Sequence, residues 1–199
     1  ILLRSRGLFR DLTDGYVLHQ NSIFRRTNIN TAYLNSRRTA SPLVFDLDGD
    51  GVEVAQLTGE ARTHFDHDAD GIKTGTAWAK ADDGLLVLDR NGNGTIDTGR
   101  ALFGNDALRE LDSNADGRID AHDARYADLR LWRDLDQDGV SDAGELQDLA
   151  SLGLTQIDLA KKDGTTQLAD GSRLDGSGGY TQNGQTRNYT DVWFADNPF

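Results

Sequence analysis

Five short aspartate-rich segments are the residues of this sequence best suited to bind an ion. Each follows the pattern D-x-[DN]-x-[DN]-G, and their first residues are spaced by 20, 23, 23 and 22 positions: Asp46, Asp66, Asp89, Asp112 and Asp134. A calcium loop takes side-chain oxygens from positions 1, 3 and 5, a carbonyl from position 7 and a bidentate acid from position 12, while glycine at position 6 allows the sharp turn. The repeat therefore predicts several calcium sites of one EF-hand-like design.

The last two loops have the fullest ligand sets. In the fifth loop these are Asp134, Asp136, Asp138, the Val140 carbonyl and Glu145. In the fourth they are Asp112, Asn114, Asp116, the Arg118 carbonyl and Asp123, a shorter acid at the closing position. We expect the fifth loop to bind calcium most tightly, because only it ends in a glutamate that can coordinate with both oxygens.

The first three loops lack the closing acid at position 12. Their candidate ligands are Asp46, Asp48, Asp50 and Glu53 in the first loop, Asp66, Asp68 and Asp70 in the second, and Asp89, Asn91, Asn93 and Asp97 in the third. Glu53 stands at position 8, so it would have to enter the first site from an unusual place. The third loop is the weakest candidate, since it has a single acid at positions 1, 3 and 5.

Oxygen ligands of this kind favour calcium over other metals. Magnesium keeps its waters and demands near-ideal octahedra, and zinc prefers histidine or cysteine. His67 and His122 lie inside loops at positions that are not ligands, so we expect both to be solvated. Apart from the loop carboxylates, the sequence shows no Ser/His/Asp or Cys/His arrangement, which makes an ordinary hydrolase the least favoured function.

The elements that must hold the loops predict an α+β fold with short helices and small β-sheet elements. Residues 121–132 and 142–152 have helical spacing, so the first of these would be one helix shared by the fourth and fifth loops. The apolar runs at 43–45 and 85–88 lead into loops as buried strands do, and residues 154–159 and 188–194 also have strand character.

Composition excludes several classes of partner. The formal charge of −12 argues against nucleic acid, and no apolar run is long enough to span a membrane. The chain has no cysteine, so bound metal is the expected crosslink of a protein outside the cell. It also has no methionine, which predicts that it is a piece of a longer protein.

A change of composition predicts a boundary near residue 41. Residues 1–40 hold seven arginines and two aspartates, a local charge of +5, so the remaining residues carry −17. Proline at position 42 also restricts the residue before it to extended conformations. We expect a basic segment or linker over 1–40, with a short amphipathic helix near its start, and a calcium-binding module over 41–199.

Several motifs resemble those of the self-processing module of iron-regulated RTX proteins. They are Pro42-Leu-Val-Phe-Asp-Leu-Asp-Gly-Asp-Gly-Val-Glu53, Phe65-Asp-His67, Ala81-Asp-Asp-Gly-Leu-Leu-Val87, Asp89-Arg-Asn-Gly-Asn-Gly94 and Leu102-Phe-Gly104, and the likeness covers residues 41 to about 160. The resemblance implies a secreted bacterial protein of toxin type whose module, on binding calcium, cuts an Asp-Pro bond at its own N-terminal edge. It also implies calcium ligands at Asp112, Asp123, Asp134 and Glu145.

The chemistry that the family implies is intramolecular. An aspartate carboxylate can attack its own backbone carbonyl carbon, close a five-membered anhydride and expel the proline nitrogen. Water, or a lysine of another protein that forms an isopeptide bond, then opens the anhydride. The catalytic position falls on Ser41 and Pro42, where serine replaces the aspartate and cannot form the anhydride. Ala101, where such modules often have glutamate, is a second departure.

Three functions remain open from the sequence. The first is a calcium-triggered self-processing module, inactive here because of Ser41. The second is a structural or adhesive calcium module with no chemistry, and the third is a dockerin-like binding module. Ser41 fits either a blocked precursor or a natural member of the family that has lost cleavage.

Overall fold

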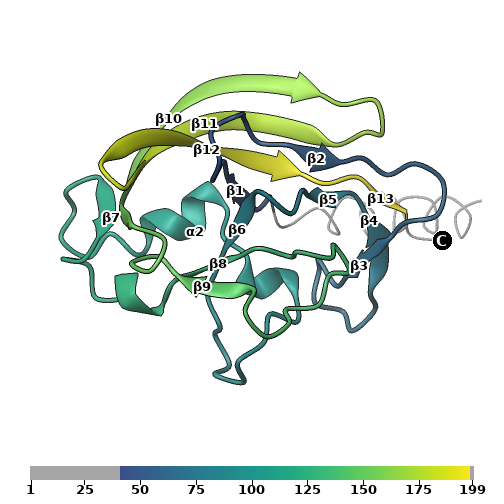
Figure 1. Ribbon diagram of the computed structural model, residues 1–199, viewed down its shortest axis with the longest axis horizontal. Helices are drawn as coiled ribbons and strands as arrows, with labels where there is room; N and C mark the ends of the chain where they lie inside the picture. The colour runs from purple at the N-terminus through teal and green to yellow at the C-terminus, as the bar shows by residue number, and fades with distance from the viewer. Residues whose placement is uncertain (1–40, 198–199) are drawn as a thin grey trace, which may run out of the picture. The chain divides into compact units, whose positions relative to one another are not determined.

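The computed structural model describes residues 41–197, and this part of the chain is mostly β-sheet (Figure 1). One sheet of eight strands has the order β7-β10-β11-β12-β1-β6-β8-β9. Its strands are β1 (Leu43–Phe45), β6 (Gly84–Val87), β7 (Arg118–Asp120), β8 (Arg130–Trp132), β9 (Leu146–Asp148), β10 (Leu154–Gln167), β11 (Arg173–Gln182) and β12 (Gln185–Trp193). Figure 1 shows β10, β11 and β12 as long curved strands that run side by side.

The short strand β1 lies at the centre of this sheet, between β12 and β6, and pairs antiparallel with both. Leu43 and Phe45 enter one apolar cluster, and Val44 enters the other. Successive side chains of a strand point to opposite faces, so β1 is buried on both. The sequence LVF is therefore a continuous apolar run, with all three side chains fully buried.

Two smaller sheets are formed mainly by residues 54–79. One has the order β13-β4-β3, from Asp196–Asn197, Thr74–Thr76 and Thr63–Phe65, and the other pairs β2 (Val54–Ala55) with β5 (Trp78–Ala79). Phe65 and Trp78 pack against Trp132 of the large sheet, with ring centroids 5.8 and 5.4 Å from it. These aromatic contacts join the small sheets to the large one.

The predicted α+β class was wrong, because the helices it required are strands and turns. Residues 121–132 contain the 3₁₀ turn η2 (Tyr126–Asp128) and strand β8, and residues 142–152 contain turns and strand β9. The longest described helix, α2 (Asn105–Arg109), has five residues, and the other helical element is the 3₁₀ turn η1 (Gly99–Ala101). Pairing of β8 with β6 and β9 outweighs the helical spacing, because it gives Leu131 and Trp132 a fully buried place.

The predicted strands at 43–45, 85–88, 154–159 and 188–194 are confirmed as parts of β1, β6, β10 and β12. No helix among residues 41–197 is long and apolar enough to cross a membrane. The amphipathic helix expected near the start of the chain lies outside the described residues.

Candidate metal loops and the site at residue 41

All five predicted loops share one backbone conformation. Positions 4 and 6 of every loop have positive φ, which L side chains rarely adopt. Position 4 is Gly49, Ala69, Gly92, Ala115 or Gln137, and position 6 is Gly51, Gly71, Gly94, Gly117 or Gly139. Three residues other than glycine keep this conformation at position 4, so the loop design and not glycine alone fixes the turn.

The first aspartate of each loop organises the turn from inside. In the fifth loop, the Asp134 carboxylate accepts hydrogen bonds from the N–H groups of Asp138 at 3.2 Å and Gly139 at 2.9 Å. The corresponding carboxylates of the other loops accept bonds from one or two N–H groups of their own turns. The local sequence thus bends the chain around one carboxylate in every loop.

Three loops bring acids together closely enough to hold one ion. The groups whose ligand oxygens lie within 4.8 Å of one another are Asp46, Asp48 and Asp50; Asp66, Asp68 and Asp70; Asp134, Asp136 and Glu145; and Asp136, Asp138 and Asp142. The third and fourth loops gather no such group among the described residues, because each has asparagine at position 3. Their amide oxygens still add ligands without adding charge.

Glu145 closes the fifth loop. Its buried carboxylate accepts hydrogen bonds from the N–H groups of Leu135 at 2.8 Å and Asp142 at 3.0 Å, and from the Trp132 indole at 3.2 Å. The loop connects the antiparallel strands β8 and β9, so strands replace the flanking helices of an EF-hand. Burial raises the pKa of Asp134 to about 6, and the charge of Glu145 adds to this. A bound cation would relieve that buried negative charge.

Asp123 occupies the closing position of the fourth loop. It is buried, and its two oxygens accept bonds from the N–H and hydroxyl of Ser113 and from the N–H of Asp120. Its carboxylate therefore fixes the two ends of the loop against each other. Strand β7 forms positions 7 to 9 of this loop and pairs with β10, which anchors the fourth loop to the edge of the large sheet.

The first loop has an acidic neighbour that sequence reasoning missed. Asp83 is almost fully buried, its Oδ2 accepts the Glu53 N–H at 2.7 Å, and its Oδ1 has no hydrogen-bond partner among the described residues. Burial raises its pKa to about 7, and the charge of Asp46 adds to the shift. The predicted ligand Glu53 instead pairs with Lys80, at 2.6 Å. The sequence signal was the pair Asp82-Asp83 just before a buried strand.

The second, third and fifth loops contact one another directly. The Lys73 amine of the second loop donates to the Gly139 carbonyl of the fifth at 3.5 Å, and the Ile96 N–H of the third donates to the Ser141 hydroxyl of the fifth at 2.8 Å. The backbone of Asp66 also forms a bridge with Thr98, which joins the second loop to the third. Order in one of these loops therefore depends on order in its neighbours.

The two loop histidines differ. His122 is exposed, as expected, and pairs with Asp120. The prediction for His67 was wrong, because its ring packs against Phe65 and Trp78 and bonds the Thr76 hydroxyl at 3.1 Å. Burial lowers its pKa to about 4, so it is neutral at pH 7.

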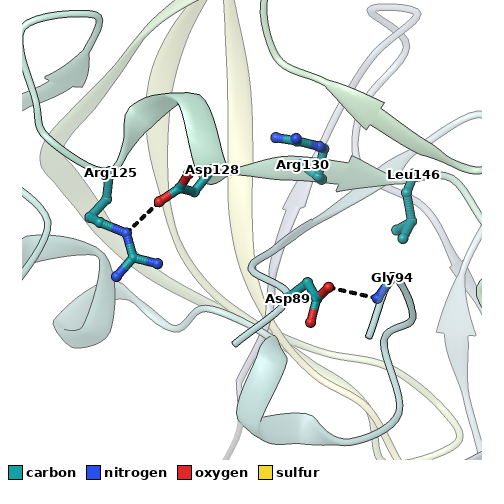
Figure 2. Close-up of a pocket in the computed structure, with 6 residues that line it drawn as sticks. All are labelled: Asp89, Gly94, Arg125, Asp128, Arg130 and Leu146. Carbon is teal, nitrogen blue, oxygen red and sulfur yellow. Dashed lines mark hydrogen bonds and ion pairs between the residues drawn. The ribbon is translucent and has the colours of Figure 1, made fainter. Parts of the chain in front are cut away.

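A cavity of about 510 Å³ lies beside the third loop, lined by Asp89, Gly94, Arg125, Asp128, Arg130 and Leu146 (Figure 2). Arg125 pairs with Asp128, and Arg130 pairs with Asp148 outside the cavity. Asp89 is held by the Gly94 N–H at 2.8 Å. Since its charged groups are already paired, we assign no ligand to this cavity.

The backbone around residue 41 is held from two sides. The Val192 N–H of β12 donates to the Pro42 carbonyl at 2.9 Å, and the Leu43 N–H donates to the Phe103 carbonyl at 2.8 Å. Gly104 is so close that a Cβ there would stand 3.1 Å from the Ser41 carbonyl oxygen. The motif Leu102-Phe-Gly104 is thus the part of the chain that packs against residues 41–43.

Asp191 is a second group that the sequence did not reveal. In β12 it lies directly opposite Leu43, its side chain is buried, and its Oδ2 accepts a bond from the Asn105 amide at 2.6 Å. Burial raises its pKa, and the neighbouring polar side chains of Ser41 and Asn105 partly offset the rise. A buried carboxyl group therefore stands beside the predicted processing position.

Comparison with known proteins defines the class. The SPM domain family matches residues 43–195, which is most of the chain, and the chain belongs to this family. It is also 47% identical over 169 residues to the iron-regulated protein FrpA of Neisseria meningitidis serogroup C. That match covers 77% of this chain and 15% of FrpA, so the chain corresponds to a small part of its relative. The predicted likeness to modules of iron-regulated proteins is confirmed.

Proposed function

We propose that this chain is a calcium-binding module of a secreted RTX-type protein, and that calcium stabilises its fold. The observation that carries the proposal is the conformation shared by five acidic loops, three of which gather carboxylates within 4.8 Å of one another. Oxygen ligands alone, in loops with glycine at position 6, favour calcium. Bound calcium would compensate the negative charge of the buried carboxylates of Asp83 and Asp134.

The module is of the self-processing kind, with its cleavage step blocked at residue 41. An aspartate there would attack its own carbonyl carbon through a five-membered ring, whereas attack by the Ser41 hydroxyl would need a strained four-membered ring. The Ser41-Pro42 bond should therefore persist, and residues 1–40 should stay attached. A lysine partner can react only with an anhydride, so an isopeptide link is expected only of a chain with aspartate at this position.

Calcium-dependent order is the first test. Trp78 and Trp132 are fully buried in edge contact at 5.4 Å, so near-ultraviolet circular dichroism reports directly on core packing. The protein in chelator should lack this signal and should gain it on addition of calcium, because binding and folding are coupled. Magnesium at the same concentration is the control. The comparison is made at pH 7.5, where a native spectrum in chelator would refute calcium-dependent folding.

A structural calcium module without chemistry is the second candidate, and Ser41 is the observation that favours it. Mass spectrometry of Ser41→Asp in calcium separates the two. Fragments that meet between residues 41 and 42, at a rate independent of dilution, support a latent self-processing site. An unbroken and fully folded Ser41→Asp chain supports the structural module. A dockerin-like module is disfavoured, since the fifth loop connects strands and not helices.

A further inference from the structure

The surroundings of Asp191 single it out among the acids of the large sheet. One oxygen is bonded to Asn105, whereas Oδ1 is buried with no hydrogen-bond partner among the described residues, and the Lys161 amine is 4.0 Å from Oδ2. None of these residues belongs to a metal loop. An acid that only stabilised the fold would be expected to have both oxygens satisfied.

The position of Asp191 in the sheet places it beside the bond before Pro42. Asp191 is paired with Leu43, and the next residue, Val192, binds the Pro42 carbonyl. The Ser41 hydroxyl lies 3.6 Å from where a Cβ at Gly104 would stand, and the next residue, Asn105, bonds Asp191. Ser41 also precedes Leu43 by two residues, so in an extended chain its side chain lies on the face where Asp191 stands opposite Leu43. A longer aspartate side chain at position 41 would extend closer to the Asp191 carboxyl group.

We propose that Asp191 is the proton-holding partner of residue 41, an inference that rests on the self-processing function proposed above. In a chain with aspartate at position 41, the two carboxyl groups share one proton. Asp191 holds it, leaves residue 41 as the carboxylate nucleophile, and gives it to the Pro42 nitrogen as that nitrogen departs. In the present chain residue 41 is serine, so no anhydride forms and Asp191 donates no proton.

The step balances without another reactant. In the Ser41→Asp chain, an oxygen of the new carboxylate forms a bond to the backbone carbonyl carbon of the same residue. The bond from that carbon to the Pro42 nitrogen breaks, and the proton of Asp191 moves to the nitrogen. The products are a five-membered anhydride at residue 41, a free secondary amine at Pro42 and an Asp191 carboxylate. Water then opens the anhydride. A positioned general acid contributes about 10²- to 10⁴-fold to such a step.

The electrostatic surroundings decide how Asp191 titrates. Burial and the charge of Asp175 on β11 raise its pKa, while Lys161 on β10 and the bond from Asn105 lower it. Burial raises the pKa of Tyr189, two residues earlier on β12, and the charge of Asp191 adds to this rise. Cleavage should therefore have a bell-shaped pH profile, whose acid limb reports ionisation of residue 41 and whose alkaline limb reports loss of the Asp191 proton.

The rate test uses the Ser41→Asp chain in calcium. Adding Asp191→Asn should slow cleavage by about 100-fold or more and remove the alkaline limb, because an amide can bond residue 41 but cannot give up a proton. Asp175→Asn is the matched control, as it removes a neighbouring charge and should change the rate less than about threefold. Asn105→Ala should move the alkaline limb to higher pH. Near-ultraviolet circular dichroism identifies any variant that fails to fold.

A second measurement needs no cleavage. Carbon-13 NMR titration of the Asp191 carboxyl in the Ser41, Ser41→Ala and Ser41→Asp chains should show the highest midpoint with aspartate at 41. If Ser41→Asp stays intact but the midpoint rises, the self-processing function fails and the pairing stands. The inference is overturned if the titration midpoint of Asp191 is the same whichever residue stands at position 41. It is also overturned if the Ser41→Asp chain with Asp191→Asn cleaves as fast as its parent and with the same pH profile.

Discussion

Gly139 of the fifth loop lies against the backbone of His64, and a Cβ added at Gly139 would stand 2.6 Å from the His64 carbonyl oxygen. The same residue has φ of +78°, as position 6 of the loop requires. One glycine thus satisfies two demands, a left-handed turn and a close approach to β3. The contact packs the fifth loop against the strand that leads into the second loop.

Gly139→Ala should therefore destabilise the calcium-bound protein far more than Gly117→Ala. Gly117 has the same loop position and a φ of +84°, but nothing lies within 4 Å of its added Cβ. Backbone strain of about 1 kcal/mol is expected for both, and displacement of the His64 backbone adds about 2 kcal/mol for Gly139 alone. Urea unfolding in calcium measures both variants, and equal losses would show that the loops do not pack as described.

Glu145→Ala should impair calcium binding and folding more than Asp89→Ala. Glu145 is buried and accepts three hydrogen bonds, so its loss removes the proposed bidentate ligand and leaves the Trp132 indole unpaired. Asp89 holds only its own turn in a loop without a closing acid. A buried donor without a partner costs about 1–3 kcal/mol. Calorimetric titration with calcium ranks the two sites, and a reversed ranking would refute the assigned ligand sets.

Protons should partly replace calcium as the stabilising cation. The pKa of Asp83 is raised to about 7 in the fold from an ordinary 3.8, so the folded state binds more protons than the unfolded state between these values. Stability without calcium then rises as pH falls from 7 towards 4. Asp134, with a pKa raised to about 6, acts in the same direction. The lowered pKa values of Asp89 and Asp120 matter only below about pH 4.

Near-ultraviolet circular dichroism in chelator, followed from pH 7.5 to 5, measures this effect. The native signal should appear as pH falls, and Asp83→Asn should show part of it already at pH 7.5. Asp106→Asn, an acid of α2 outside the loops, is the control and should follow the parent curve. A signal that decreases on acidification would give the opposite sign and exclude protonation of these buried acids as a source of stability.

The loops were predictable because their information is local. The ligand positions and the glycine of a loop lie within twelve residues, so one segment defines both the turn and the acids that face its centre. The apolar runs of β1 and β6 were predictable for the same reason, since a short continuous run fits a strand buried on both faces.

The missed features depend on residues far apart in the chain. The Arg130–Trp132 segment is a strand because β6 and β9 lie on either side of it, and helical spacing alone could not reveal those partners. Asp83 reaches the first loop, and Asp191 reaches residue 41, only through the pairing of the large sheet. An acid between Tyr189 and Val192, two residues of strand character, was the available signal for Asp191, but its partner could not be identified from one sequence.

Gly104 gives a last test of the site at residue 41. Its φ of −93° suits alanine, so Gly104→Ala adds no backbone strain, yet the new Cβ would meet the residue 41 carbonyl oxygen at 3.1 Å. That oxygen belongs to the carbonyl that the aspartate of a Ser41→Asp chain must attack. A displacement of a few tenths of an ångström would misalign the attack, and misplacement of about 1 Å can cost 10²-fold in rate.

We expect Gly104→Ala to slow cleavage of the Ser41→Asp chain by about tenfold or more while its calcium-bound spectrum stays native. Gly164→Ala is the matched control, because nothing lies within 4 Å of its added Cβ, and its cleavage rate should match the parent. Hydrogen exchange at the Leu43 N–H, which bonds the Phe103 carbonyl, should become faster in Gly104→Ala alone. Faster exchange with an unchanged rate would show that residues 103–104 support β1 without aligning the bond before Pro42.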